Sequence, residues 1–356
     1  LHPRVRRQRQ MCIRDRHTIM KKILFAAVAA LAITGCSQNE EIEKAAKTAE
    51  IGFNAIVKNT TRAAVTNMGN LGNFKVHSYI TGTAFDGTTA ELGTAYMNGV
   101  LFETIDNTTW TKATSDTKTY YWPSDASKSV QFFAYPSTLI SDFSIPDTGT
   151  AGYPSFNYTV DKEADEPGDL VVAYESNKTA TSEGVNAGKL TLNFKHILSR
   201  INFAYIPGNT NLIYTVTAVK IADIKGGTAK YTFSASNGAW DVTSGTSKEY
   251  TYTVTQSPNV VENKSYYMLG GEDASLMLFP QDVAKKVITV TYTSKDDDGV
   301  QVFSGDKTVT LPDNSKWEVG KNILYILTLP AGGTEMTVTP KVSEWNAAED
   351  KEQTAQ

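Results

Sequence analysis

The cysteine at position 36 ends a pattern that favours covalent lipid attachment. A basic start, Lys21-Lys22, precedes an apolar run over residues 23–33, and Thr34-Gly35 supplies small residues before the cysteine. The run is shorter than the roughly 20 residues that a membrane-spanning helix needs, and it suits a signal-peptide core. We therefore expect export, cleavage before Cys36 and a lipid on its sulfur. The alternative is an ordinary secretory signal in which Cys36 is incidental.

Other residues that could carry chemistry are few after Cys36, which is the last cysteine of the chain. We expect His77 to face solvent or a partner from a strand, and His196 to make a structural hydrogen bond at a strand end. The sequence contains no phosphate-binding glycine loop, metalloprotease helix or nucleophile elbow. Asp296 to Gly299 could bind calcium through carboxylate oxygens, but its spacing favours a solvated hairpin turn. We predict no catalytic residue, no cofactor and no metal.

An acidic loop around Pro167-Gly168 raises one enzymatic alternative. Paired carboxylates hydrolyse glycosides when they face each other across a cleft, so an enzyme of glycan metabolism is the third interpretation. The carboxylates of this loop are Glu163, Asp165, Glu166 and Asp169.

The charge balance argues against nucleic acid as a partner. Of the 34 basic and 38 acidic residues in the sequence, eight basic and one acidic lie before Cys36, which leaves a formal net charge of −11 from Cys36 onward. Nucleic-acid binding needs a basic face. The Arg-rich residues 1–19 resemble translated adapter DNA, and we expect the natural start at Met20.

The sequence beyond Glu50 predicts β-strands, and these strands must position any functional residues. Beyond Glu50 many short runs alternate apolar and polar residues and are rich in Thr, Val, Tyr and Phe, while Gly, Asn, Asp and Pro separate them. Short strands without intervening helices predict an all-β chain of antiparallel sandwiches or barrels. We expect residues 1–19 upstream of the protein, a signal peptide over 20–35, a tether over 36–49, domains over 50–207 and 208–346, and a polar tail over 347–356.

Four groups of motifs together resemble the fimbrillin family, the pilin-type lipoproteins of Gram-negative anaerobes. The groups are Tyr120-Tyr121-Trp122-Pro123 with residues 130–136, Asp169 to Ala173 with 192–201, Leu276 to Gln281, and Trp317 to Tyr325 with Val342-Ser343-Glu344-Trp345. The resemblance implies two tandem transthyretin-like antiparallel β-sandwich domains. It also implies a structural, adhesive fimbrial subunit at the outer membrane whose partners are other fimbrial subunits, in a homopolymer or a heteropolymer.

Assembly by strand exchange follows from this resemblance and from strand physics. A sandwich that lacks one strand exposes an apolar groove bordered by unpaired backbone, which a neighbour's strand can fill. The first predicted strand places Ile51, Phe53, Ala55 and Val57 on one face. Arg62 follows it among small polar residues, and the resemblance implies cleavage there by an arginine-specific protease; the alternative is an ordinary surface arginine.

A candidate donor strand lies near the end of the chain. Its shared face consists of Met336, Val338, Pro340 and Val342. Pro340 lacks an N–H, which suits an edge or donor strand, although the segment could equally be the last strand of the second domain. The runner-up function is a monomeric surface lipoprotein that binds host protein or glycan through Trp110, Tyr120, Tyr121 or Trp240.

Overall fold

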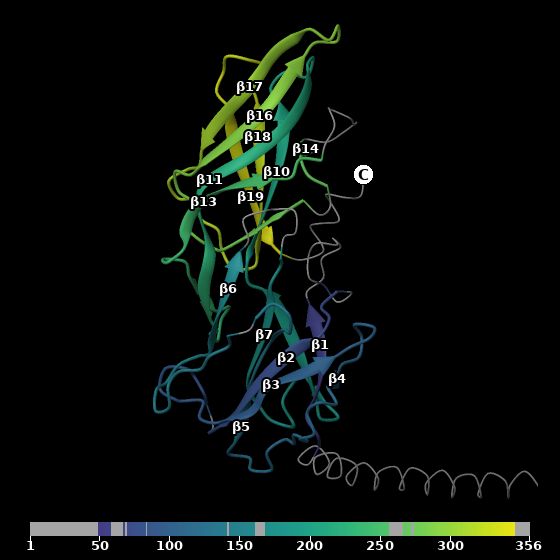
Figure 1. The fold of residues 1–356 in the computed structure, drawn as a ribbon, viewed down its shortest axis with the longest axis vertical. Helices are drawn as coiled ribbons and strands as arrows, with labels where there is room; N and C mark the ends of the chain where they lie inside the picture. The colour runs from purple at the N-terminus through teal and green to yellow at the C-terminus, as the bar shows by residue number, and fades with distance from the viewer. Residues whose placement is uncertain are drawn as a thin grey trace, which may run out of the picture.

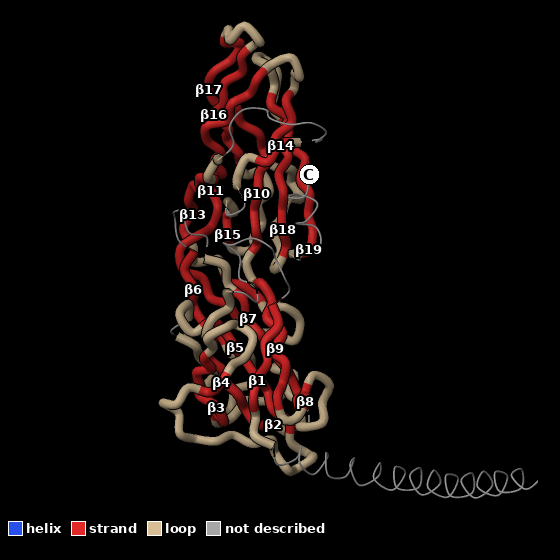
Figure 2. Tube along the Cα trace, turned by 90° about the vertical axis from the view of Figure 1, so that its right-hand side faces the viewer, coloured by secondary structure: helices blue, strands red, loops and turns tan. Residues whose placement is uncertain are grey.

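The computed structural model describes residues 49–57, 67, 70–82, 84–140, 142–160, 168–255, 266–271 and 274–345. Every helix-or-strand element among these residues is a strand, and there are nineteen (Figure 2). The predicted all-β class is therefore confirmed. None of the described residues forms a helix able to cross a membrane.

The N-terminal part of the chain forms an eight-stranded sheet. Its order is β1-β9-β7-β5-β2-β3-β4, with β8 paired to β9. All neighbours are antiparallel except β1 and β9, which are parallel. The strands are β1 (Gly52–Val57), β2 (Phe74–Thr81), β3 (Ala95–Glu103), β4 (Thr111–Lys112), β5 (Ser129–Pro136), β7 (Val171–Lys178), β8 (Val185–Asn186) and β9 (Lys189–His196).

This sheet curls until its two ends approach each other. Glu50, just before β1, forms a bridge with Tyr121, which follows β4 in the chain. The Ile51 N–H donates to the Tyr120 carbonyl at 2.8 Å, and the Trp122 N–H donates to the Ala49 carbonyl at 3.3 Å. The sheet is therefore a nearly closed barrel. Alternate residues of its strands point inward and form one apolar core.

The C-terminal part is a sandwich of two sheets. A five-stranded sheet has the order β14-β10-β18-β19, with β15 beside β10, and a six-stranded sheet has the order β12-β11-β16-β17, with β13 and β6 also on β11. Their inner faces share one apolar core. The strands are β6 (Ser155–Val160), β10 (Ser199–Pro207), β11 (Ile213–Thr232), β12 (Ala239–Asp241), β13 (Thr246–Tyr252), β14 (Tyr267–Met268), β15 (Leu276–Leu278), β16 (Val287–Lys295), β17 (Gln301–Thr310), β18 (Lys321–Leu329) and β19 (Thr337–Glu344).

One early strand crosses into the later part of the molecule. β6 pairs with the second half of β11, from Gly227 opposite Val160 to Thr232 opposite Ser155. The two parts stack along the long axis of an elongated molecule, with β6 between them (Figure 1). β10 pairs with β18 over Arg200–Pro207, so residues just before position 207 belong to the C-terminal sandwich.

Candidate functional site

The inner face of β1 closes the core of the N-terminal sheet. Ile51, Phe53, Ala55 and Val57 are between 1% and 5% exposed, and Ile56 on the opposite face is 49% exposed. The alternation of β1 places these four side chains on one face, as the sequence predicts. We call β1 together with Ile51, which directly precedes it, the plug, because these side chains fill part of the core of the N-terminal sheet.

Phe53 is the centre of this plug. Its ring packs edge-on against Phe102 at a centroid distance of 4.8 Å, against Phe132 at 5.4 Å and against Phe74 at 6.5 Å. Such T-shaped pairs are favourable because the ring edge carries positive and the ring face negative partial charge. We call the three surrounding rings the Phe53 cage. They come from β2, β3 and β5, so no local sequence pattern could have revealed them.

The backbone of β1 is held mainly by one neighbour. Six residues, Gly52 to Val57, stand in register with Lys189 to Phe194 of β9. On the other side, the contacts to Tyr120–Trp122 involve residues 49–51 at the start of the strand. Gly188, at φ +83°, makes room here, because a Cβ would lie 2.7 Å from the Glu50 carbonyl oxygen. Arg62 lies outside the described residues.

β19 is held in a different way. It pairs antiparallel with β18 over eight residues, and within the described part of the chain the sheet order ends at β19. Met336, just before the strand, is buried, and Val338 is half-buried against the sandwich core. Pro340 is exposed and Val342 is 59% exposed. The face that the sequence predicts is thus only partly covered, and Pro340 stands on an edge strand, where a missing N–H is tolerated.

Trp345 anchors the end of β19. The side chain is buried, and its ring stacks on His196 at a centroid distance of 4.2 Å and 7° between planes. The backbone N–H of Trp345 donates to the Gly320 carbonyl at 3.1 Å. His196, the last residue of β9, also lies 3.0 Å from an Asp169 carboxylate oxygen through Nδ1. The expected structural hydrogen bond of His196 is confirmed. The anchoring role of Trp345 was missed, although this residue ends one of the family motifs.

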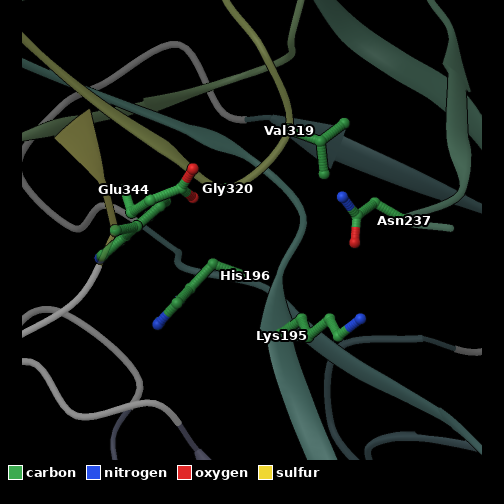
Figure 3. Close-up of a pocket in the computed structure, with 7 residues that line it drawn as sticks. Lys195, His196, Asn237, Val319, Gly320 and Glu344 are labelled. Carbon is green, nitrogen blue, oxygen red and sulfur yellow. The ribbon is translucent and has the colours of Figure 1, made fainter. Parts of the chain in front are cut away.

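A cavity of about 330 Å³ lies where β9, β18 and β19 meet (Figure 3). Glu344 and the ring of His196 approach it from one side, and Asn237 and Lys195 from the other. The His196 imidazole is already engaged by Asp169 and Trp345. The cavity thus lies beside the C-terminal end of β19, and His196 has a structural role there. Its lining residues are Lys195, His196, Asn237, Val319, Gly320, Glu344 and Trp345.

The prediction that His77 faces solvent or a partner was wrong. His77 is buried, its Nε2 lies 3.0 Å from the Tyr135 hydroxyl, and its ring stacks on Phe143 at 3.8 Å. Burial, with a smaller contribution from nearby Lys75, lowers its pKa from 6.5 to about 4. The strand alternation failed here because β2 has covered side chains on both of its faces.

The acidic segments do not form a metal site among the described residues. Asp296 caps the turn between β16 and β17: its carboxylate accepts from the Val300 N–H at 2.8 Å, and its carbonyl accepts from the Gly299 N–H at 3.0 Å. The favoured hairpin turn is therefore present. In the other acidic loop, Asp169 is buried against His196. Glu163, Asp165 and Glu166 lie outside the described residues.

The four aromatic residues considered for glycan binding differ in exposure. Trp110 and Tyr120 are buried, and Trp240 packs against the sandwich core. Tyr121 is 50% exposed. Three of the four side chains therefore serve packing.

Comparisons with known proteins identify the family. A family model described as fimbrillin-like matches residues 61–345, and a model of the prokaryotic membrane lipoprotein lipid attachment site matches residues 20–37. The chain is 24% identical to the fimbrium subunit Fim1C of Phocaeicola vulgatus, over 93% of this chain and 98% of that protein. The predicted lipid-anchored protein of the cell surface and fimbrium is confirmed by these matches.

A solved structure supports the same fold. A fimbrial protein from Bacteroides vulgatus aligns with a TM-score of 0.62 and 20% identity, over 84% of this chain and 100% of that one. The fold and the family match agree over nearly the whole described region. The chain belongs to the fimbrillin-like family.

Proposed function

We propose that this protein is a structural subunit of a fimbrium. It reaches the outer membrane with a lipid on Cys36 and joins other subunits by strand exchange. Its role is structural and adhesive rather than catalytic. The observation that carries the proposal is the contrast between β1, a strand buried as a plug, and β19, an edge strand with an exposed apolar face.

In this proposal β1 marks the acceptor groove. Burial of a large apolar side chain is worth about 1.5–3 kcal/mol, and Ile51, Phe53 and Val57 are all nearly fully buried. Cleavage after Arg62 would cut the covalent link between β1 and β2. Once β1 leaves, the open core and the unpaired edge of β9 favour a replacement strand strongly.

β19 supplies the donor strand. Its Val342 is 59% exposed and its Pro340 is exposed, so leaving β18 uncovers little new apolar surface at these positions. Release must break the ladder to β18 and withdraw Met336 and Trp345 from their buried positions. Insertion into the groove of another subunit would then bury Val338, Pro340 and Val342 more completely than in the monomer.

We also propose that the molecule consists of two tandem transthyretin-like domains. The N-terminal sheet ends with β9 at His196, and β10 of the C-terminal sandwich begins at Ser199. We therefore place the boundary at Ile197-Leu198 rather than at 207, because β10 pairs along its length with β18.

The proposal is tested by a single proteolytic cut. From Cys36 onward the chain has two arginines, Arg62 and Arg200, and Arg200 is fully buried. An arginine-specific protease should therefore cut the folded mature protein only after Arg62. We expect the cut protein, mixed with the other fimbrial subunits of its own cells, to form multimers that resist unheated detergent, visible on gels and as filaments by electron microscopy.

The control is Arg62→Lys, which keeps the charge and removes the cleavage site. This variant should stay monomeric under the same treatment. A cut protein that remains monomeric in this mixture by native mass spectrometry would contradict strand exchange. It would favour the second function, a monomeric surface lipoprotein that binds host protein or glycan.

A further inference from the structure

The Phe53 cage sets a size requirement for whatever strand fills the acceptor groove. Phe53 is 1% exposed, and three aromatic rings surround it at 4.8 to 6.5 Å. Protein cores are close-packed, so a smaller side chain at this position leaves an empty volume that the rigid rings cannot close. A single methylene in an apolar pocket already changes affinity by about 10- to 200-fold.

The position two residues later has the opposite requirement. Ala55 is 5% exposed and lies in the same core. A larger side chain there would overpack the core and push neighbouring residues out of their preferred conformations. The groove therefore has a fixed pattern along the strand: a large residue at 51, an aromatic ring at 53, a small residue at 55 and a medium residue at 57.

β19 of an identical copy does not match this pattern. Its apolar face repeats every two residues, as the face of β1 does, but it contains no aromatic ring. In any register that turns this apolar face toward the groove, parallel or antiparallel, the cage would receive Met336, Val338, Pro340 or Val342. Aligning Met336 with Ile51 places Val338 in the cage and Pro340 at the Ala55 position. There the proline ring is larger than the methyl group of Ala55 and would overpack the core.

We propose that the groove discriminates against β19 of its own kind and accepts a strand from a different subunit. That strand carries an aromatic side chain at the Phe53 position and a small residue at the Ala55 position. This inference rests on the proposed function, because it concerns the strand that replaces β1. It makes Phe53 and its cage the specificity determinant of assembly, and it makes the chain a member of a mixed fimbrium rather than of a homopolymer.

The test changes only the sequence of an added peptide, so the protein itself carries no substitution. The mature chain is cut after Arg62, unfolded in denaturant, and refolded with an excess of a labelled peptide that competes with the chain's own first fragment. The peptides are residues 49–57, residues 335–344, and residues 335–344 with Val338→Phe and Pro340→Ala. The double substitution gives the donor the pattern of β1. A matched control carries Val338→Ala and Pro340→Ala.

We expect the peptide of residues 49–57 to enter the groove and the natural peptide of residues 335–344 to bind at least about 100-fold more weakly. The Val338→Phe/Pro340→Ala peptide should recover most of this loss, and the Val338→Ala/Pro340→Ala control should not. Equal binding of the natural 335–344 peptide and the 49–57 peptide would overturn the inference and leave strand exchange intact. If even the 49–57 peptide stays out, β1 is not replaceable, and the proposed function falls together with the inference.

Discussion

His77 shows at the residue scale how burial changes a side chain that would otherwise gain charge in mildly acidic solution. Its pKa is lowered to about 4 because the imidazole is covered by Phe143 and Tyr135 and lies near Lys75. In the unfolded chain the pKa returns to about 6.5, so the unfolded state binds the proton first as the pH falls. The folded state consequently loses stability between pH 6.5 and about 4.

We predict that His77→Gln reduces this acid sensitivity. Glutamine keeps a polar group near the Tyr135 hydroxyl and does not titrate. Relative to its own value at pH 7, the variant should lose up to about 3 kcal/mol less stability by pH 4 than the natural protein does. Urea unfolding at several pH values measures the difference. Parallel stability profiles for the two proteins would show that His77 does not contribute.

Sequence reasoning at this scale succeeded where a residue's role depends on its own strand. The alternation over residues 51–57 was sufficient to place four side chains on one face. The Phe53 cage was not predictable, because Phe74, Phe102 and Phe132 come from three separate strands. His77 was assigned wrongly because alternation does not reveal which strands are covered on both faces.

At the scale of elements, β1 and β19 differ in how they are fixed. β1 is held along its whole inner face, whereas β19 is held by its ladder and by buried residues near its two ends. Removing the buried side chain at one end of β19 should therefore weaken the attachment of β19 without affecting β1. Trp345, which directly follows β19, is the anchoring residue whose removal we use to test this.

We predict that Trp345→Ala releases β19. Removing a large buried aromatic side chain costs about 3–5 kcal/mol, and here the stack on His196 is lost. Hydrogen exchange of the β19 amides should accelerate by at least about 100-fold, while the β1 amides keep their protection. Val342→Ala serves as control, because this side chain is already 59% exposed. Unchanged exchange in β19 would mean that its ladder alone holds it.

The parallel pairing of β1 and β9 could not be derived from the sequence. The two strands lie more than 130 residues apart in the chain, and each alternates in the way that an antiparallel partner would. The presence of these strands was predictable because alternation is a local pattern. The partner and direction of each strand were not predictable, because they depend on how segments far apart in the sequence come together in the folded protein.

At the scale of the whole molecule, β6 links the two parts. Its Phe156 packs against Tyr231 at 5.1 Å, Phe233 at 5.8 Å and Trp240 at 6.3 Å, all from the C-terminal part. Both neighbours of β6 in the chain belong to the N-terminal sheet. The two parts should therefore unfold together.

We predict that the natural protein unfolds in one calorimetric transition and that Phe156→Ala separates it into two. The substitution should also cost about 3–5 kcal/mol, because the side chain is almost fully buried. Thr159→Ala, at an exposed position of the same strand, should leave the single transition in place. Two transitions in the unmodified protein would show that β6 does not couple the parts.

β11 runs for 20 residues, a length of about 65 Å at the usual rise of a strand, with register shifts between Val216 and Ala218 and between Ile221 and Ile224. It joins β16 over its first half and β6 over its second half. Flowing fluid that pulls on an anchored filament would stretch the molecule lengthwise. Under such tension the ladders beside a continuous strand are sheared and share the load across many hydrogen bonds, whereas peeling breaks them one at a time. In the proposed fimbrium, β11 would therefore let each subunit carry such a load along the direction of this strand.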